Sequence, residues 1–225
     1  MLPIAHIRNG FRTKFAIPRQ AGIARKIPSV IVFEPSYRAP EAVRGIEAFS
    51  HLWLIWNFSE NERAGWSPTV RPPRLGGNKR VGVFATRSPF RPNPIGLSCV
   101  KLDSVEFTHD HGPLLRVSGA DLMDGTPIFD IKPYLPFADC HPEATGGLPG
   151  ALVGDAVEVY IPDNLLTHIP AAERETIREI LAQDPRPAYQ DEPDRIYGFP
   201  YGNLEIHFKV EGKHLEVVNV QATNS

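Results

Sequence analysis

Cysteine is scarce in this sequence of 225 residues, which contains only Cys99 and Cys140. Two widely separated cysteines are too few for a disulfide framework or a cysteine-based zinc site, and we expect both to be structural in a reduced, cytoplasmic setting. No apolar run approaches the length that a membrane span requires. The opening residues, MLPIAHIRNG, lack a basic segment followed by an apolar core, so we expect no secretory signal. The composition predicts a globular chain without a membrane partner or a metal site.

Glycine-rich nucleotide-binding motifs are also missing. The sequence contains neither GxGxxG nor GxxxxGK[ST], and the paired glycine nearest the basic region is Gly76-Gly77. Segments that are typical of strands follow one another without regular intervening helices, which argues against a doubly wound α/β sheet. The sequence therefore predicts neither a Rossmann nor a P-loop nucleotide site.

Acidic residues are absent from one long segment, although the net charge of the chain is only −2. Between Arg63 and Lys101 there is no Asp or Glu, while the segment carries Arg63, Arg71, Arg74, Lys79, Arg80, Arg87, Arg91 and Lys101. Such a one-sided distribution attracts anions, even where the overall charge argues against a nucleic-acid binder. The segment predicts a polyanionic partner or an anionic ligand.

Proline, by contrast, is abundant: the chain contains 23 prolines, roughly twice the usual share. Residues 82–98 read GVFATRSPFRPNPIGLS and include Pro89, Pro92 and Pro94. Proline removes a backbone donor and pushes the preceding residue toward extended backbone, so neither a helix nor a central strand passes through these positions. We predict a stiff loop that holds Arg87 and Arg91 in place.

The remaining pattern predicts a mainly β domain over residues 1–147 and a small α+β domain over 148–225. Strands are expected at 29–35 and at 51–58, the second buried on both faces, and around a hairpin turn at THDHG. Further β-type runs are TPIFDIKPYLPF and DAVEVYIP. The second domain contains the clearest helix, 171–183, with one apolar face, followed by a terminal hairpin that turns at EGK.

Several of these segments have a structural as well as a functional interpretation. Proline–arginine loops occur as ordinary exposed turns, and a histidine such as His51 is often a core residue bonded to a carbonyl. Asp121 and Asp124 are placed to cap a turn through Asx bonds. His109 and His111 lie in the expected hairpin tip, where a solvated turn is favoured over a metal site. Together the segments supply guanidiniums, aromatic surface and carboxylates, but no nucleophile with its base, which suits an enzyme that positions two large ligands.

Six segments, in this order, carry a resemblance to a known family: KFAIPRQ, VRGIEAFSHLW, RPPRLGG, GVFATRSPFRPNPIGLS, DLMDGTPIFDIKPYLPF and QDPRPAY. They are distributed along most of residues 5–140, with a further patch near 183–189, and they closely resemble the TrmO (TsaA-like or YaeB-like) family of tRNA methyltransferases. The resemblance implies an S-adenosylmethionine-dependent enzyme that methylates N6 of threonylcarbamoyl-adenosine beside the anticodon. It also implies an antiparallel β-barrel as the cofactor domain, and a homodimer with the cofactor cleft close to the subunit interface.

On this resemblance, alignment of the methyl donor with N6 is the main catalytic requirement. Arg87 or Arg19 is expected to pair with the carboxylate of the donor through a two-pronged bond. Asp124 is the expected acceptor of the N6 proton, so Arg87 and Asp124 are the catalytic candidates. The expected cofactor-binding residues are Pro18, Arg19, Gln20, His51, Leu52, Arg87, Leu97, Asp121, Leu122, Asp124, Gly125, Thr126 and Pro127.

The resemblance further implies contacts with a threonine-type tRNA, whose backbone phosphates provide affinity and little sequence information. Phe84, Phe90 or Tyr134 is expected to stack on a splayed-out base of the anticodon loop. The expected substrate-binding residues are Arg71, Arg74, Arg80, Arg91, Asn93, Tyr134, Arg186 and Tyr189, the last two lying in the C-terminal domain.

Two other functions remain open at this stage. One is a methyltransferase of the same fold that acts on another RNA or on a small molecule. The other is a non-catalytic module that binds adenosine or RNA. The basic segment favours a polyanion as partner, and it does not by itself identify the base that is modified.

Overall fold

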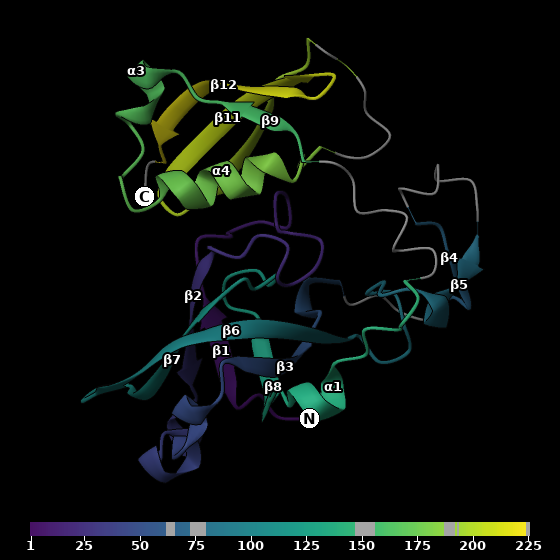
Figure 1. Cartoon of the computed structure of the whole chain (residues 1–225), viewed down its shortest axis with the longest axis vertical. Coiled ribbons are helices and arrows are strands. Elements are labelled where there is room, and N and C mark those ends of the chain that lie inside the picture. Colours follow the sequence, from purple (N-terminus) through teal and green to yellow (C-terminus); the bar gives the residue numbers. More distant parts are fainter. Residues whose placement is uncertain (62–65, 73–79, 147–155, 187–191, 193, 224–225) are drawn as a thin grey trace.

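The computed structural model describes residues 1–61, 66–72, 80–146, 156–186, 192 and 194–223. The described chain forms a β-barrel and a smaller part that combines a sheet with helices, and Figure 1 shows the smaller part above the barrel. This arrangement confirms the predicted fold class, a mainly β chain with an antiparallel barrel and a small α+β part.

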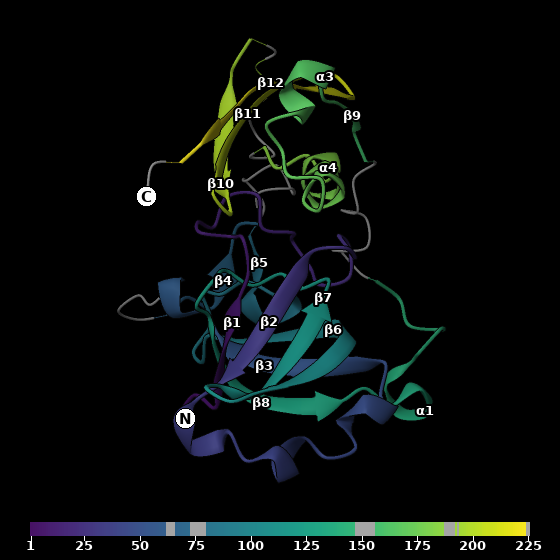
Figure 2. The ribbon, with the colours of Figure 1, turned by 90° about the vertical axis from the view of Figure 1, so that its left-hand side faces the viewer.

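The barrel closes through the strand order β1-β2-β7-β6-β3-β8, with β8 pairing back onto β1, and every pairing is antiparallel. Figure 2 shows these strands wrapped around one another in the lower part of the molecule. Closure pairs both edges of the sheet, so no barrel strand is left as an open edge. The strands are β1 (Ala5–Arg8), β2 (Pro28–Phe33), β3 (His51–Asn57), β6 (Ile95–Thr108), β7 (Gly112–Ser118) and β8 (Pro127–Pro133).

Alternating burial along the strands places one set of side chains inside the barrel. In β3, Leu52, Leu54 and Trp56 are buried, while Trp53 and Ile55 on the other face stay partly exposed. The expectation that this strand is buried on both faces was therefore wrong. A barrel strand has an interior and an exterior face, and the exterior of β3 is only partly covered by the segment that follows β8. That segment includes the short helix α1 (Pro136–Asp139), whose Asp139 accepts a hydrogen bond from Trp53 Nε1 at 3.0 Å.

The proline-rich stretch forms a loop, as predicted. A two-stranded flap of β4 (Thr69–Val70) and β5 (Val81–Gly82) leads into a 3₁₀ turn at Val83–Ala85, and β6 begins at Ile95, immediately after the last proline. The prolines thus lie between regular elements. Arg91 donates to the carbonyls of Thr86 and Ser88 at 3.0 and 3.3 Å, which folds the loop back on itself.

The C-terminal part is a four-stranded sheet in the order β10-β11-β12-β9, with its helices on one face (Figure 2). The predicted terminal hairpin is confirmed as β11 (Leu204–Glu211) and β12 (His214–Ala222), and the predicted helix as α4 (Arg174–Ala182), which buries Ile177, Ile180 and Leu181. The other elements are β9 (Glu158–Tyr160), β10 (Tyr197–Tyr201) and the short helix α3 (Asp163–Leu166).

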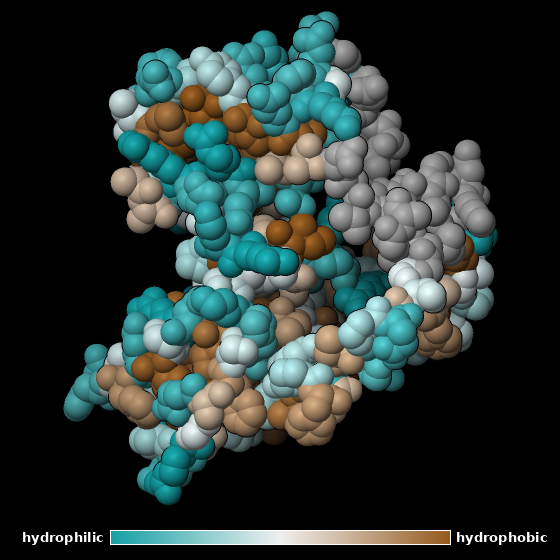
Figure 3. Space-filling view, viewed as in Figure 1, coloured by the Kyte–Doolittle hydropathy of each residue, from teal (hydrophilic) through white to brown (hydrophobic). Residues whose placement is uncertain are grey.

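The two parts are joined by the segment between β1 and β2, residues 9–27, which we call the linking loop. Its apolar side chains Phe11, Ala16, Ala24 and Ile27 belong to the hydrophobic core of the C-terminal sheet. Phe11 meets Tyr201 edge to face, with ring centroids 5.3 Å apart. Figure 3 shows the two parts as separate lobes with the surface hollowed between them. The linking loop therefore belongs to the barrel by chain order and to the C-terminal core by packing.

Candidate active site

A cleft of about 480 Å³ opens at the end of the barrel where β3 ends and β6 begins. Its lining comes from the linking loop, the end of β3, the proline-rich loop with the start of β6, and the turn before β8. These segments are distant in sequence, so closure of the barrel is what brings them together. The predicted residues found in the lining are Pro18, Arg19, Gln20, Arg87, Arg91, Leu97, Asp121 and Thr126.

One wall of the cleft is aromatic and tightly packed. The Trp56 and Phe58 rings lie 4.2 Å apart, centroid to centroid. Gly96 faces Trp56 across the β3–β6 pairing, and a Cβ atom at position 96 would lie only 2.2 Å from the indole ring. Glycine is therefore required at position 96 because any side chain would displace this wall.

A chain of hydrogen bonds runs from this wall to a carboxylate. Trp56 Nε1 donates to Ser98 Oγ at 2.9 Å, and Ser98 Oγ donates to Asp121 Oδ1 at 2.5 Å. Trp56 and Ser98 are buried, whereas Asp121 is partly exposed and lines the cleft. Burial raises the pKa of Asp121 above its usual value, while the Ser98 hydroxyl, the N–H groups of Asp121 and Ala21, and the Arg87 charge oppose the rise.

Another part of the cleft lining is cationic. The Arg87 guanidinium donates to Gln20 Oε1 at 2.5 Å, which connects the proline-rich loop to the linking loop. Gln20 Nε2 donates to the Arg19 carbonyl at 2.6 Å, and the Arg19 guanidinium donates to the Arg186 carbonyl at 3.4 Å. Lys14 completes this side and donates to the Glu60 carbonyl. The cleft thus presents several fixed positive groups around an aromatic wall.

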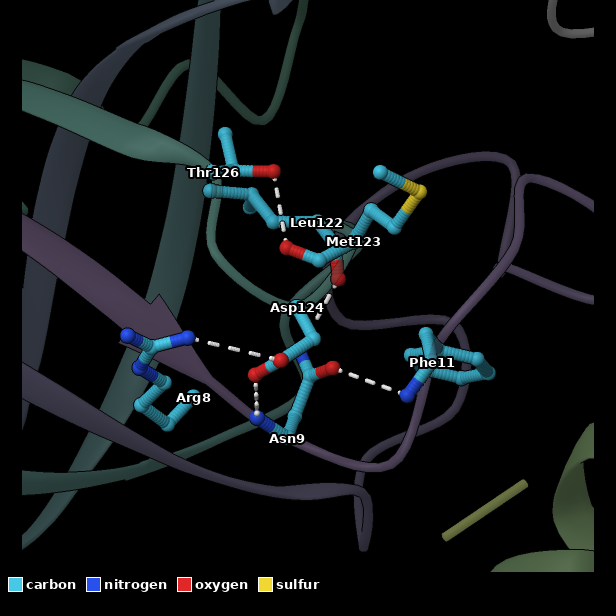
Figure 4. A network of polar contacts seen from close by, with 7 residues as sticks. All are labelled: Arg8, Asn9, Phe11, Leu122, Met123, Asp124 and Thr126. Atoms are coloured by element: carbon cyan, nitrogen blue, oxygen red, sulfur yellow. Dashed lines mark hydrogen bonds and ion pairs between the residues drawn. The ribbon is translucent and has the colours of Figure 1, made fainter. Parts of the chain in front are cut away.

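Asp124, the expected proton acceptor, lies outside the cleft lining. Its carboxylate accepts the Asn9 N–H at 3.0 Å and pairs with the Arg8 guanidinium at 3.5 Å, and its own N–H donates to the Phe11 carbonyl at 2.8 Å. Figure 4 shows the carboxylate turned toward Arg8 and Asn9. These contacts attach the turn before β8 to the start of the linking loop.

The other residues predicted in that turn pack in the core, shape the backbone or line the cleft. Leu122 is buried in the barrel core, and Gly125 adopts a left-handed conformation, with φ of 78°, that favours glycine. Thr126 donates its hydroxyl to the Met123 carbonyl at 2.7 Å and forms part of the cleft, while Pro127 begins β8. Met123 also lines the cleft, so the turn contributes alternate residues to the site and to the core.

His51, Leu52 and Tyr134 lie away from the cleft, at the opposite end of β3. Trp56 lies five residue steps along the extended strand from His51, a distance of about 17 Å. His51 contacts Ser50 and packs edge to face with Tyr134, whereas Leu52 is fully buried in the barrel core. The predicted roles of His51 and Leu52 in binding the cofactor, and of Tyr134 in binding the substrate, are therefore not supported by proximity to this cleft within one subunit.

Among the predicted substrate residues that the structure describes, Arg91 alone lines the cleft. Arg71, Arg80 and Asn93 are exposed, and Arg80 is supported by a hydrogen bond to Thr69 Oγ1 at 3.1 Å. Arg186 is nearly buried and makes a two-pronged ion pair with Asp184, both bonds being 2.9 Å. Its guanidinium is therefore engaged locally in the C-terminal part, while its carbonyl accepts the Arg19 guanidinium from the linking loop. Arg74 and Tyr189 lie outside the described residues.

Sequence reasoning did not identify Lys14, Trp56, Phe58, Ser98 or Met123 as site residues. Trp56 and Ser98 read as ordinary strand positions, and only the pairing of β3 with β6 places both beside Asp121.

Within the described chain, no cluster of three or more His, Cys, Asp or Glu side chains is arranged to hold a metal ion. No helix in the described ranges combines the length and apolarity that a bilayer crossing needs.

Comparisons with known proteins agree with this architecture. Residues 6–140 match the family model of the tRNA-methyltransferase O N-terminal domain, and residues 157–223 match the TrmO C-terminal domain. A tRNA (adenine(37)-N6)-methyltransferase of Escherichia coli is 44% identical over 222 residues, covering 95% of this chain and 94% of the relative. A putative S-adenosylmethionine-dependent methyltransferase of Pseudomonas aeruginosa is 43% identical over 213 residues, covering 92% and 90%. A crystal structure of TrmO superimposes with a TM-score of 0.79 at 35% identity, covering 98% of this chain and 97% of that one.

The comparisons thus define a methyltransferase whose N-terminal part is a closed β-barrel and not a Rossmann-like sheet. Because family models match most of the chain and full-length relatives exceed 40% identity, the chain belongs to the TrmO family of S-adenosylmethionine-dependent tRNA (adenine-N6)-methyltransferases.

Proposed function

We propose that this enzyme methylates N6 of threonylcarbamoyl-adenosine next to the anticodon of threonine-type tRNA, at the position numbered 37 in its relatives' names. The observation that carries the proposal is the cleft, which combines cationic side chains with an aromatic wall. It lies at one end of the barrel, and the barrel is the part of the chain that matches the family model of the N-terminal domain. The donor and the substrate base both carry a carboxylate, and guanidiniums bind carboxylates in a two-pronged manner.

The residues of the cleft fit S-adenosylmethionine, which supplies a methyl group on a cationic sulfur when it is bound. A volume of about 480 Å³ lies within the range of small-molecule sites. Arg87 and Arg19 are available for the donor's carboxylate, and the tilted Trp56–Phe58 pair offers apolar surface for adenine. Gln20 and the backbone at Leu97 would hold the adenosine portion.

The tRNA is proposed to lie across the flap and the proline-rich loop. Exposed Arg71 and Arg80 on the flap and Arg91 at the cleft suit backbone phosphates. Trp66 and Phe84 form an exposed aromatic pair on the flap, with 53% and 73% of their surfaces accessible and ring centroids 6.3 Å apart. Phe84 immediately precedes the segment that enters the cleft at Thr86, so a base stacked there would be adjacent to the methyl donor.

Replacing both Trp66 and Phe84 with Ala is expected to weaken tRNA binding by about tenfold to a hundredfold, because stacking of a base on an aromatic ring contributes about 1–3 kcal/mol. Filter binding measures the loss of affinity, and cofactor binding should stay unchanged. Phe107→Ala, which removes a ring that is 59% exposed on β6, is the control and should leave tRNA affinity as it is. A change in subunit association with normal tRNA affinity would instead assign the pair to an interface between copies.

The remaining features of the proposal concern assembly. We propose a homodimer in which the exposed apolar side chains of Ile95 and Leu97, at the mouth of the cleft, contact the second subunit. Residues 1–147 are proposed as the catalytic domain and 148–225 as a domain that helps to grip tRNA, in the cytoplasm where tRNA is modified. The substrate is RNA and not DNA in this proposal. Light scattering during size-exclusion chromatography measures the mass of the assembly.

The deciding experiment uses purified enzyme, methyl-labelled S-adenosylmethionine and two preparations of one threonine tRNA, with and without the threonylcarbamoyl group. Mass spectrometry of the digested nucleosides is expected to show label only in methylated threonylcarbamoyl-adenosine. Label in the unmodified tRNA as well would remove the requirement for prior modification. A bound cofactor with no label in either tRNA would favour another RNA or a small molecule as acceptor.

A further inference from the structure

The cleft contains few carboxylates among many cations. Its described acidic residues are Glu60, which is exposed, and Asp121, which is connected to Trp56 through the Ser98 hydroxyl. The charged side chains that share the cleft with Asp121 are Lys14, Arg19, Arg87, Arg91 and Glu60, contributed by the linking loop, the proline-rich loop and the segment after β3. Asp121 is therefore the carboxylate that a substrate held against the wall would meet.

The geometry of Asp121 is fixed from behind. Ser98 Oγ accepts the Trp56 indole N–H, so its own proton points to Asp121 Oδ1. Because Trp56 and Ser98 are buried in the barrel, the carboxylate has little freedom to rotate. A carboxylate held in one orientation beside a binding cleft is what proton transfer in a transition state requires.

Asp124 lacks these properties although it belongs to the same turn. Its two carboxylate oxygens are engaged by the Arg8 guanidinium and the Asn9 N–H, and Figure 4 shows the carboxylate pointing away from the side chains of Met123 and Thr126, which line the cleft. Its removal would loosen the linking loop without removing a group from the cleft. The two aspartates of the DLMDG segment thus have separate tasks.

We propose that Asp121 is the catalytic base that accepts the proton of the N6 nitrogen during methyl transfer. The N6 lone pair bonds to the methyl carbon while the carbon–sulfur bond breaks, its electron pair remaining on sulfur, which becomes a neutral thioether. The N6–H bond electrons stay on nitrogen and the proton passes to the Asp121 carboxylate. The positive charge on sulfur and the negative charge on the Asp121 carboxylate are therefore neutralised in the same step. Asp121, which is partly exposed, then releases the proton to water.

This assignment rests on the proposed function and predicts a pH profile. Asp121 accepts a proton only in its ionised form, so the single-turnover rate should rise with pH through the pKa of Asp121 and then level off. Since burial raises that pKa, the rising limb should lie above the ordinary range of an aspartate.

The test compares Asp121→Asn with Asp124→Asn in single-turnover methylation of threonylcarbamoylated tRNA from about pH 5 to about pH 9. Asp121→Asn is expected to slow transfer by about a hundredfold or more and to abolish the rising limb, with the dissociation constant of the donor changed less than about threefold. Asp124→Asn should keep the limb and lose rate only as far as it loses stability. Circular dichroism and thermal unfolding establish that both variants are folded.

Two results would overturn the proposal. One is an Asp121→Asn enzyme whose rate stays within a few-fold of the unsubstituted enzyme, and the other is a loss of rate that equals its loss of donor affinity. If the unsubstituted enzyme is inactive on this tRNA but active on another acceptor, the proposed substrate fails alone and the comparison is made with that acceptor. Absence of transfer to any acceptor would overturn both.

Discussion

Arg87→Ala is expected to weaken binding of S-adenosylmethionine by about tenfold to a hundredfold, because hydrogen bonds to a charged group contribute about 1.5–3 kcal/mol each. Arg87 reaches across the cleft to Gln20, which fixes one edge of its guanidinium and leaves the rest of the fork for a carboxylate. Calorimetry with the donor, without tRNA, measures the change. Arg87→Lys retains the charge and loses the two-pronged geometry. Its affinity for the donor should therefore lie between those of the unsubstituted enzyme and Arg87→Ala.

The same substitution should shift the pH dependence. The Arg87 charge lowers the pKa of Asp121, so its removal raises that pKa further and moves the rising limb of the rate toward higher pH. Arg44→Ala is the matched control, since Arg44 is an exposed arginine whose ion pair with Glu41 spans 3.9 Å outside the cleft. Unchanged donor affinity together with weaker tRNA binding would assign Arg87 to a phosphate of the substrate.

Sequence reasoning located most of the longer strands and the site loops because their signals are local, but it did not predict β1 or β10. The proline spacing of residues 82–98, the hairpin around His109 to His111 and the apolar face of α4 depend on neighbours in sequence. The linking loop with Gln20 and the proline-rich loop with Arg87 were identified from composition and resemblance. The structure brings these two side chains within hydrogen-bond distance.

Non-local features were not predictable in the same way. Trp56, Ser98 and Asp121 are separated by dozens of residues, and only the registers of a closed barrel connect them. The two aspartates of the turn are equivalent in a sequence pattern, whereas the Arg8 and Asn9 contacts distinguish Asp124 from Asp121. His51 belongs to a segment that carries the family resemblance, but it lies at the end of β3 that is opposite the cleft.

The linking loop is the clearest case of structure that local patterns do not reveal. Its apolar residues are too irregular to suggest a strand or helix, yet Phe11 is fully buried in the core of the C-terminal sheet. The Lys26 ammonium pairs with Glu175 on α4 at 2.8 Å, and the Gly202 N–H donates to the Gly10 carbonyl at 2.9 Å. Because the same loop carries Arg19 and Gln20 into the cleft, the C-terminal part holds one side of the site in place.

Phe11→Ala should therefore affect both stability and cofactor binding. Truncating a buried phenylalanine typically lowers the free energy of unfolding by about 3–5 kcal/mol, a large share of the roughly 5–15 kcal/mol that stabilises a folded domain. For a chain of this size the melting temperature should fall by roughly 6–20 °C. Thermal unfolding measures the loss, and donor affinity measured below the transition should fall as well, because the released loop no longer fixes Gln20 against Arg87.

Phe137→Ala separates these effects from the general loss of a ring, since Phe137 is 88% exposed on α1 and should change neither quantity. A Phe11→Ala protein that melts early yet binds the donor normally would show that the barrel alone orders the cleft. A protein that keeps its melting temperature would contradict the shared core itself. A fall in both quantities would mean that the junction of the two parts sets the affinity of a site whose lining lies mostly in the barrel.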